Sequence, residues 1–251
     1  MYLKILILGD SISEGLGSKK YNYSNFLKEN LYKRGINAEI FNLAYSGTTI
    51  KYVESIKKNI LEINPDVTIL FYGNVDGMLR PNINHYPNYF GILPKRYQKN
   101  GMLNPRPFYS GLWYKKLIQM IDSFIRTILN KILLKFQGSY TWVSLDDFKH
   151  TYDNVINYLL SINSKVICTS TVCIDENFFP GTLESYKKFN NIIQSISLGI
   201  KNVCFFDIFN ELQSYKIEDV FLADHFHLSI NGYKILANRY ADLIDEMYRC
   251  R

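Results

Sequence analysis

The sequence predicts an α/β fold, a three-layer, doubly wound parallel sheet of five strands with a helical and irregular insertion after the third strand. Short apolar runs recur at strand length, several of them on consecutive residues, as in parallel strands that are covered on both faces. Segments with helical spacing separate these runs, and such alternation favours a doubly wound sheet with right-handed crossovers. One long interruption of the alternation predicts the insertion.

The predicted strands are LKILIL at 3–8, AEIFNL at 38–43, DVTILFY at 66–72, KVICTS at 165–170 and NVCFFD at 202–207. The predicted helices lie near 23–34, 49–63, 145–162, 183–198 and 230–248. This succession is typical of a flavodoxin-like sheet, in which ligands bind at the carboxyl ends of the strands. We therefore expect the residues that follow each strand to form the functional site.

The chain has 251 residues, of which 47% are hydrophobic and 21% charged, so it can bury a substantial core. We expect a single domain over 1–251, since two independent domains would be cramped at this length. About 70 residues separate the third strand from the next helix, far more than an ordinary loop, which places the insertion at about 78–143. Its first half is rich in Pro, aromatic and basic residues and predicts an irregular lid or groove wall.

The second half of the insertion, from Leu112 to Phe136, predicts a long, basic, amphipathic helix. The residues with three-and-four spacing are Leu117, Ile121, Phe124, Ile125, Ile128, Ile132 and Phe136. Such a stripe usually faces a core or a second copy of the chain, and that is the leading expectation. The sharper alternative is peripheral contact with a membrane, because basic flanks and Trp113 suit the headgroup region.

The net charge is +6 and the pI is about 8.9, without a block of like charges. Nucleic-acid binding is not expected, whereas a polyanionic glycan or an anionic membrane surface would fit this charge. No stretch approaches the ~20 apolar residues of a membrane span. The N-terminal MYLKILILGDS reads as a first strand, which predicts a cytoplasmic protein, peripheral to the inner membrane face if the helix at 112–136 docks there.

The cysteines and histidines do not form a metal site in the sequence. Cys168, Cys173, Cys204 and Cys250 lack CxxC spacing and are expected to be reduced core residues. His85 and His150 have no partner at useful spacing. We therefore expect neither a metal nor another cofactor.

Ser11 follows the first predicted strand in the segment GDSIS. A serine on a strand-to-helix turn at the carboxyl edge exposes its hydroxyl, and a helix amino terminus there can stabilise developing negative charge. An Asp-Ser pair after a strand is also an ordinary helix cap, and this segment alone favours the cap.

The segment DHFHLS near the end of the chain places Asp224 three residues before His227. A tight turn can bring the two side chains together, so that Asp224 accepts the Nδ1 proton of His227 and leaves Nε2 free to take a proton from Ser11. The alternative is a surface histidine followed by a helix cap at Ser229. His225 is a nearby competitor, but the spacing from the carboxylate selects His227.

Two further strand ends carry groups that can donate hydrogen bonds to a developing oxyanion. Gly47, in NLAYSGTT, can bring its backbone N–H close to a bound carbonyl, and Asn74, in YGNVDG, can donate from its side-chain amide. Each segment alone is a turn signal. Four such signals at four carboxyl-edge positions are hard to attribute to turns.

In their order, these segments resemble the SGNH or GDSL hydrolases, a family named for invariant Ser, Gly, Asn and His in four sequence blocks. The resemblance spans residues 9 to about 232, apart from the insertion. The matching residues are Ser11, Gly47, Asn74, and Asp224 with His227. The resemblance implies that Ser11 attacks an ester carbonyl, that His227 is the base oriented by Asp224, and that an oxyanion hole is formed by Ser11 N–H, Gly47 N–H and the Asn74 amide.

The third block departs from the family pattern, which usually reads Gly-x-Asn-Asp. Tyr72 stands at the usual glycine, and Val75 separates Asn74 from Asp76. We expect Asp76 to tie down this loop, with a simple turn cap as the alternative.

The resemblance implies a serine enzyme that forms an acyl-enzyme intermediate, and the nature of the second nucleophile stays open. Water would make an esterase that removes acyl, in the first place acetyl, groups from a carbohydrate or glycan. A sugar hydroxyl would make an O-acetyltransferase acting on a cell-surface polysaccharide precursor, and a non-catalytic glycan-binding module is a third interpretation. Arg80, Arg106 and Tyr109 of the insertion are candidate substrate-binding residues, which suit stacking on sugars and pairing with acidic groups. Packing of the insertion onto the domain explains them equally well.

Overall fold

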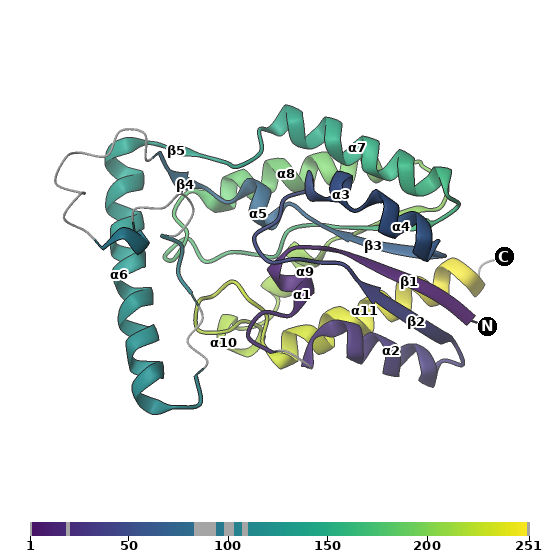
Figure 1. Cartoon of the computed structure of the whole chain (residues 1–251), viewed down its shortest axis with the longest axis horizontal. Helices are drawn as coiled ribbons and strands as arrows, with labels where there is room; N and C mark the ends of the chain where they lie inside the picture. Colours follow the sequence, from purple (N-terminus) through teal and green to yellow (C-terminus); the bar gives the residue numbers. More distant parts are fainter. Residues whose placement is uncertain (1, 19–20, 83–93, 98–102, 107–109, 250–251) are drawn as a thin grey trace.

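The computed structural model describes residues 2–18, 21–82, 94–97, 103–106 and 110–249. Within them, five parallel strands form one sheet in the order β2-β1-β3-β6-β7, with helices on both sides (Figure 1). This order is the flavodoxin-like one. The predicted three-layer, doubly wound sheet is confirmed.

The sheet strands are β1 (Tyr2–Gly9), β2 (Asn37–Asn42), β3 (Val67–Phe71), β6 (Lys165–Thr169) and β7 (Val203–Phe206). Each of them begins and ends within about one residue of its predicted apolar run. Every residue of the central strand β3 is buried, as its unbroken VTILF run requires of a parallel strand covered on both faces.

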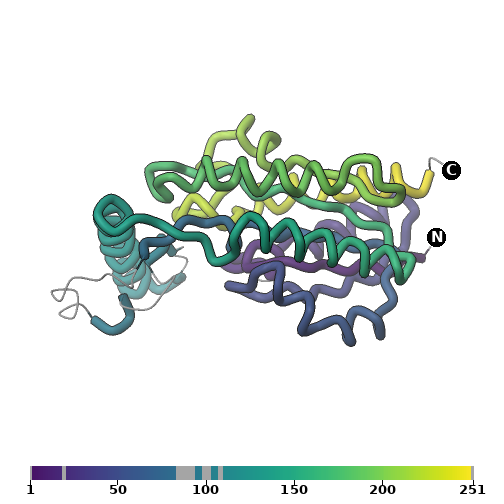
Figure 2. The backbone as a smooth tube through the Cα atoms, turned by 90° about the horizontal axis from the view of Figure 1, so that it is seen from above, coloured from purple at the N-terminus to yellow at the C-terminus, as the bar shows by residue number. Residues whose placement is uncertain are grey.

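Two hydrophobic clusters form the core, one on each face of the sheet. Alternate side chains of β1 contribute to them, with Ile5 and Ile7 on one face and Leu6 and Leu8 on the other. The first face is covered by α2 (Tyr23–Lys33) and α11 (Ile230–Arg249), together with the short helices α9 (Ile208–Gln213) and α10 (Ile217–Val220). The second is covered by α3 (Tyr52–Ser55), α4 (Lys57–Ile63), α7 (Leu145–Ser161) and α8 (Thr182–Ser197). Figure 2 shows α7 and α8 running along the length of the sheet.

Two differences from the predicted helices have local causes. The segment at 49–63 forms α3 and α4 instead of one helix, because the backbone leaves helical geometry at Ile56, where φ is −112°. The four-residue helices α1 (Ser11–Glu14) and α5 (Asn74–Gly77) were not predicted, since they are too short to show a helical period.

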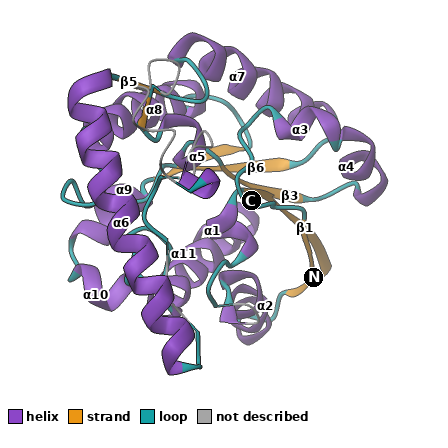
Figure 3. Cartoon of the chain, turned by 60° about the vertical axis from the view of Figure 1, so that its left-hand side comes forward, coloured by secondary structure: helices purple, strands orange, loops and turns teal. Residues whose placement is uncertain are grey.

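The two ends of the insertion lie side by side, because a short strand at its start pairs with one at its end. Its described elements are β4 (Arg80–Pro81), the 3₁₀ turn η4 (Lys95–Tyr97), α6 (Trp113–Gln137) and β5 (Ser139–Tyr140). β4 pairs antiparallel with β5, with Arg80 opposite Tyr140. α6 stands upright at the left of Figure 1, beyond the carboxyl ends of the strands, and Figure 3 shows it as one long helix on that side of the molecule.

The helix predicted at 112–136 is confirmed. Of the two partners expected for its apolar stripe, the core is wrong, whereas a second copy of the chain stays a prediction. The exposed stripe residues are Leu117, Ile121, Phe124, Ile128, Ile132 and Phe136. The buried residues of α6 are Ser123, Arg126, Asn130 and Leu133, most of them polar. The helix is turned this way because its polar side chains bind the rest of the insertion: Asp122 accepts a hydrogen bond from the Tyr97 hydroxyl at 2.7 Å, and Ser123 Oγ accepts one from the Arg106 N–H at 3.2 Å.

In the described ranges, no helix is long and apolar enough to cross a membrane. Cys168, Cys173 and Cys204 are free thiols, and burial raises the pKa of Cys168 to about 11. Cys250 and His85 lie outside the described residues.

Candidate active site

Ser11 is the first residue of α1, at the carboxyl end of β1. Asp10 caps this helix, since its carboxylate accepts a hydrogen bond from the Ile12 N–H at 3.0 Å. Tyr233 of α11 donates from its hydroxyl to the Ile12 carbonyl at 2.9 Å and so holds the helix against the domain. The serine therefore lies in the first turn of α1, at the carboxyl edge of the sheet.

A turn before α11 brings Asp224 and His227 together. Asp224 Oδ2 lies 2.5 Å from His227 Nδ1, and its Oδ1 accepts the backbone N–H of His227 at 3.1 Å. The turn passes through His225 in the left-handed region, with φ +54°. This conformation costs free energy for a residue with a side chain, and it allows the carboxylate to fold back onto the imidazole.

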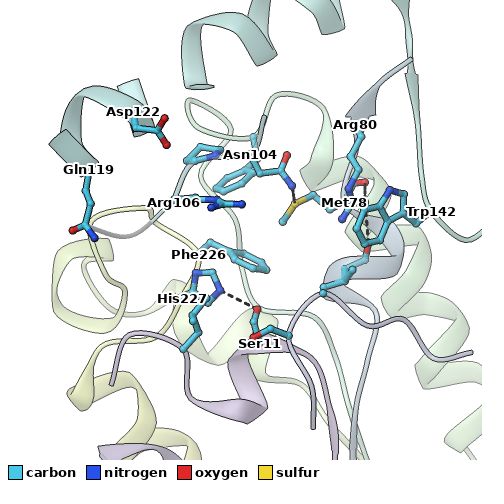
Figure 4. A pocket seen from close by; sticks show the side chains of 16 residues that line it. Ser11, Met78, Arg80, Asn104, Arg106, Gln119, Asp122, Trp142, Phe226 and His227 are labelled. Atoms are coloured by element: carbon cyan, nitrogen blue, oxygen red, sulfur yellow. Dashed lines mark hydrogen bonds between the residues drawn. The ribbon is translucent and has the colours of Figure 1, made fainter. Parts of the chain in front are cut away.

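His227 completes the link to Ser11, because its Nε2 lies 2.9 Å from Ser11 Oγ (Figure 4). Asp224 is fully buried, and His227 and Ser11 are nearly so. The structure thus joins the imidazole and the carboxylate, three residues apart, to a hydroxyl more than 200 residues away in the sequence. Such a chain can move a proton from the hydroxyl to the imidazole while the carboxylate fixes the ring tautomer.

The competing histidine points elsewhere. His225 Nδ1 lies 2.6 Å from Asp175 Oδ2, and its ring stacks on Phe178 with the centroids 4.2 Å apart. These contacts stabilise the strained turn, and no hydrogen bond between His225 and Ser11 is found in the described part of the chain. His150 is exposed and contacts Asn154.

The loop that carries Gly47 lies beside Ser11 and is fastened to α1. The Glu14 carboxylate accepts the Ser46 N–H at 2.7 Å. Gly47 itself has φ +75°, a conformation that glycine adopts without strain. Both Ser11 and Gly47 line the same cavity.

Asp76 ties this loop to the loop after β3. Its Oδ1 accepts the Ile50 N–H at 2.9 Å, and its Oδ2 accepts the Gly73 N–H at 3.0 Å. Burial raises the pKa of the Asp76 carboxyl to about 7, although both N–H donors favour its ionised form. The structural role expected for Asp76 agrees with these contacts.

Asn74 is the first residue of α5, after β3, and lies below the cavity surface. Its side chain is fully buried, Oδ1 accepts the Val172 N–H at 2.9 Å, and the neighbouring Val75 lines the cavity. The amide nitrogen Nδ2 is buried without a hydrogen-bond partner among the described residues. The Asp10 carboxyl, whose Oδ2 is also unpaired, lies close enough for this amide to lower its pKa, so the two buried groups face one another below the serine.

Asp10 places a second carboxyl beneath the serine. Burial raises the pKa of Asp10 to about 6, while the Ile12 N–H and the charge on His227 oppose the shift. The Asn74 amide is also close enough to lower this pKa. An ionised Asp10 therefore stabilises an imidazolium at His227.

A cavity of about 480 Å³ opens above Ser11 and His227, between the sheet edge and the insertion (Figure 4). Arg80 and Arg106, both predicted substrate-binding residues, lie in its wall. Arg80 is buried, donates to the carbonyls of Val75 and Met78 at 3.0 and 2.8 Å, and stacks on the ring of Trp142 at 3.8 Å. Arg106 is exposed and points toward the middle of the cavity in Figure 4.

Several cavity residues were missed by sequence reasoning, namely Trp142, Asn104, Gln119 and Asp122. Trp142 reaches the site because β5 pairs with β4. Strands of two residues are too short to be predicted from a sequence pattern. The predicted residue Tyr109 lies outside the described residues.

Among the described residues, no group of three or more His, Cys, Asp or Glu side chains could hold a metal ion. The Asp224 carboxylate, which a metal would need, is already bonded to His227 and to two backbone N–H groups. The groups at this site can act through proton transfer and hydrogen bonding.

The family model of the GDSL-like Lipase/Acylhydrolase family matches residues 7–235. The chain belongs to this family and is a carboxylic ester hydrolase. The chain matches none of the curated proteins.

Solved structures share the fold. The acetyl xylan esterase AlAXEase is 18% identical, over 96% of this chain and 100% of that one, with a TM-score of 0.61. A lipase/acylhydrolase from Enterococcus faecalis is 15% identical, over 98% and 96%, with a TM-score of 0.63. Axe2, an acetyl-xylooligosaccharide esterase from Geobacillus stearothermophilus, is 16% identical, over 98% and 94%, with a TM-score of 0.60. At these identities the likeness concerns the fold alone.

Proposed function

We propose that this protein is a serine esterase that removes acetyl groups from a carbohydrate through an acyl-enzyme intermediate. The observation that carries the proposal is the unbroken chain from Ser11 Oγ through His227 to Asp224 at the floor of an open cavity. Cysteine usage also favours a reducing, cytoplasmic compartment, because Cys168, Cys173 and Cys204 are unpaired.

In the proposed reaction, Ser11 Oγ attacks the ester carbonyl while His227 Nε2 takes its proton. The imidazolium, held by Asp224, then gives this proton to the departing sugar oxygen, and the acyl group stays on Ser11. Water enters, loses a proton to His227 and attacks the acyl carbon. Collapse of the second tetrahedral intermediate returns the proton to Ser11 and releases acetate.

The oxyanion of each tetrahedral intermediate is assigned to three donors, the N–H groups of Ser11 and Gly47 and the Asn74 amide. The positions of Ser11 and Gly47 in the cavity wall support the first two donors, and the assignment of Asn74 is supported by the resemblance of its segment to the asparagine block of the family. Donors of this kind act on charge that is present in the transition state.

Asn74→Ala is expected to lower kcat by roughly 100- to 1000-fold with little change in KM, because the amide stabilises developing charge. Alanine also removes the acceptor for the Val172 N–H. Asn74→Asp is the matched variant, since it keeps that acceptor and lacks the donor. Steady-state kinetics on p-nitrophenyl acetate, with Tm measured in parallel, are the test.

Both Asn74 variants should lose rate. Asp76→Ala serves as the comparison, because it leaves the Ile50 and Gly73 N–H groups unpaired and should lower Tm. If Asp76→Ala abolishes turnover in folded protein while both Asn74 variants keep their rate, the oxyanion assignment is wrong.

The carbohydrate substrate is supported by the chemistry of the cavity wall. Trp142, 38% exposed, offers a ring for stacking, and Arg106 offers donors for sugar hydroxyls or acidic substituents. Two of the solved structures with this fold are named as esterases of acetylated xylan or xylo-oligosaccharide.

Time-resolved mass spectrometry with acetylated xylo-oligosaccharides tests the function directly. We expect an acetyl adduct on Ser11 and release of free acetate at a rate that matches deacetylation. Transfer of the acetyl group to an added sugar in preference to water would replace the esterase with an O-acetyltransferase. Binding without any adduct or product would indicate a non-catalytic glycan-binding module.

Arg106→Ala is expected to lower kcat/KM on an acetylated acidic oligosaccharide by about tenfold, because a charged hydrogen bond to the sugar is lost. Its rate on p-nitrophenyl acetate should stay within about twofold of the parent, since the small ester does not need that wall. Arg96→Ala is the matched control, an exposed arginine of the same insertion that lies outside the cavity wall. Equal losses of Arg106→Ala on both substrates would contradict a substrate-binding role.

A further inference from the structure

The long helix α6 presents an apolar face to solvent. The exposed apolar residues along it are Trp113, Tyr114, Leu117, Ile118, Met120, Ile121, Phe124, Ile128, Ile132 and Phe136. Trp113 at its start is 78% exposed, Phe124 in the middle 67%, and Phe136 at its end 76%. Isolated exposed apolar residues are common, but a stripe over a whole helix marks an interaction surface.

The orientation of α6 is set by the polar face opposite this stripe. Asp122 accepts a hydrogen bond from the Tyr97 hydroxyl at 2.7 Å, and Ser123 Oγ accepts one from the Arg106 N–H at 3.2 Å. Turning the apolar stripe inward would break these two bonds to the rest of the insertion. The stripe therefore faces outward.

The charges around the stripe favour one kind of partner. The exposed charged residues of α6 are Lys115, Lys116, Lys131 and Lys135. Asp122 is the one acid on the helix, and it is turned inward and paired with Arg126. By helical spacing Lys131 and Lys135 share the face of the stripe, so two copies meeting through it would bring four lysines together without a compensating acid from either helix, whereas anionic lipid headgroups complement them.

We propose that α6 docks on an anionic lipid bilayer, with its apolar stripe at the headgroup and acyl boundary and its lysines against the lipid phosphates. Trp113 and Tyr114 at one end are the residue types that prefer this boundary. The helix lies on the membrane and does not span it, in keeping with its polar inner face.

Docking would also place the cavity close to the lipid. Gln119 and Asp122 line the cavity from the inner side of α6, so the bilayer would lie about one helix diameter, roughly 10 Å, from that wall. The cavity would then take acylated molecules held at a membrane surface. The docking itself does not depend on the ester chemistry.

The test is flotation of the full chain with vesicles of phosphatidylcholine, with and without phosphatidylserine. We expect binding to the phosphatidylserine vesicles that weakens as salt is raised. Lys131→Gln with Lys135→Gln should reduce partitioning by about 30-fold, since each lysine near the surface contributes on the order of fivefold. Phe124→Ser should reduce it about tenfold or more.

Tyr32→Ser is the matched control, because Tyr32 is 73% exposed on α2. It should bind vesicles like the parent, and all variants should turn over p-nitrophenyl acetate at the parental rate, which shows that they fold. A blue shift of tryptophan emission with vesicles, absent in Trp113→Phe, would locate the contact on α6.

The proposal is overturned if the parent fails to float with phosphatidylserine vesicles, or if Tyr32→Ser loses as much binding as Phe124→Ser. It is also overturned if the parent sediments as a dimer that Phe124→Ser dissociates while vesicles are not bound. Loss of docking with intact ester turnover, or the reverse, separates the failure of this proposal from that of the proposed function.

Discussion

Ser11→Ala is expected to lower kcat on p-nitrophenyl acetate by about a millionfold, to the rate of the remaining site without a nucleophile. The reason is geometric, since Ser11 Oγ is the hydroxyl that His227 Nε2 contacts, at 2.9 Å. The fold should survive, because the side chain makes no other hydrogen bond in the described residues. Stopped-flow kinetics measure the loss of turnover, and mass spectrometry measures the loss of the acyl adduct on the protein.

Ser13→Ala provides the matched control within the same helix. Ser13 is fully buried and accepts a hydrogen bond from the Tyr23 hydroxyl at 2.9 Å, away from the imidazole. This variant should lose about 1 kcal/mol of stability and keep most of its rate. Parental turnover by Ser11→Ala, or an acetyl adduct that persists in it, would exclude Ser11 as the nucleophile.

His227→Ala is expected to lower kcat by a similar factor, about 10⁵- to 10⁶-fold, because the base and the acid for the leaving group are removed together. Removal of the imidazole also leaves the buried Asp224 carboxylate with backbone donors alone. Part of the effect should therefore appear as a lower Tm. Added imidazole should restore a measurable fraction of the rate if the missing group is the base.

His225→Asn tests the choice between the two histidines. Asparagine tolerates the left-handed conformation at φ +54° and can still donate to Asp175. We expect its rate to stay within about tenfold of the parent. If His225→Asn abolishes turnover and His227→Ala does not, the assignment of the base is reversed.

These two experiments rest on a site that the sequence largely predicted. Ser11, Gly47 and Asn74 each follow a predicted strand, and this order was visible because parallel strands place their carboxyl ends at one edge. The DxxH segment was visible just ahead of the last predicted helix. The pairing of Asp224 with His227 was equally local, since three residues and a tight turn bring the two side chains within 2.5 Å.

The surroundings of the site were less predictable. Trp142 enters the cavity through a two-residue strand pair, and Asp76 reaches across to the Ile50 N–H. Both contacts join segments that are far apart in the sequence, and no periodic pattern of residues predicts such contacts. Loops in general acquire their positions from the elements that they pack against.

The sequence by itself determined the sheet, the strand ends and the residues that meet at them, because apolar periodicity and turn chemistry act over a few residues. It also determined that α6 is an amphipathic helix. Only the tertiary structure decided which face of that helix is buried, because polar contacts such as those of Asp122 and Ser123 competed with the burial of the apolar stripe and prevailed. A helical period gives the two faces of a helix, whereas the partners that each face meets are set by the rest of the fold.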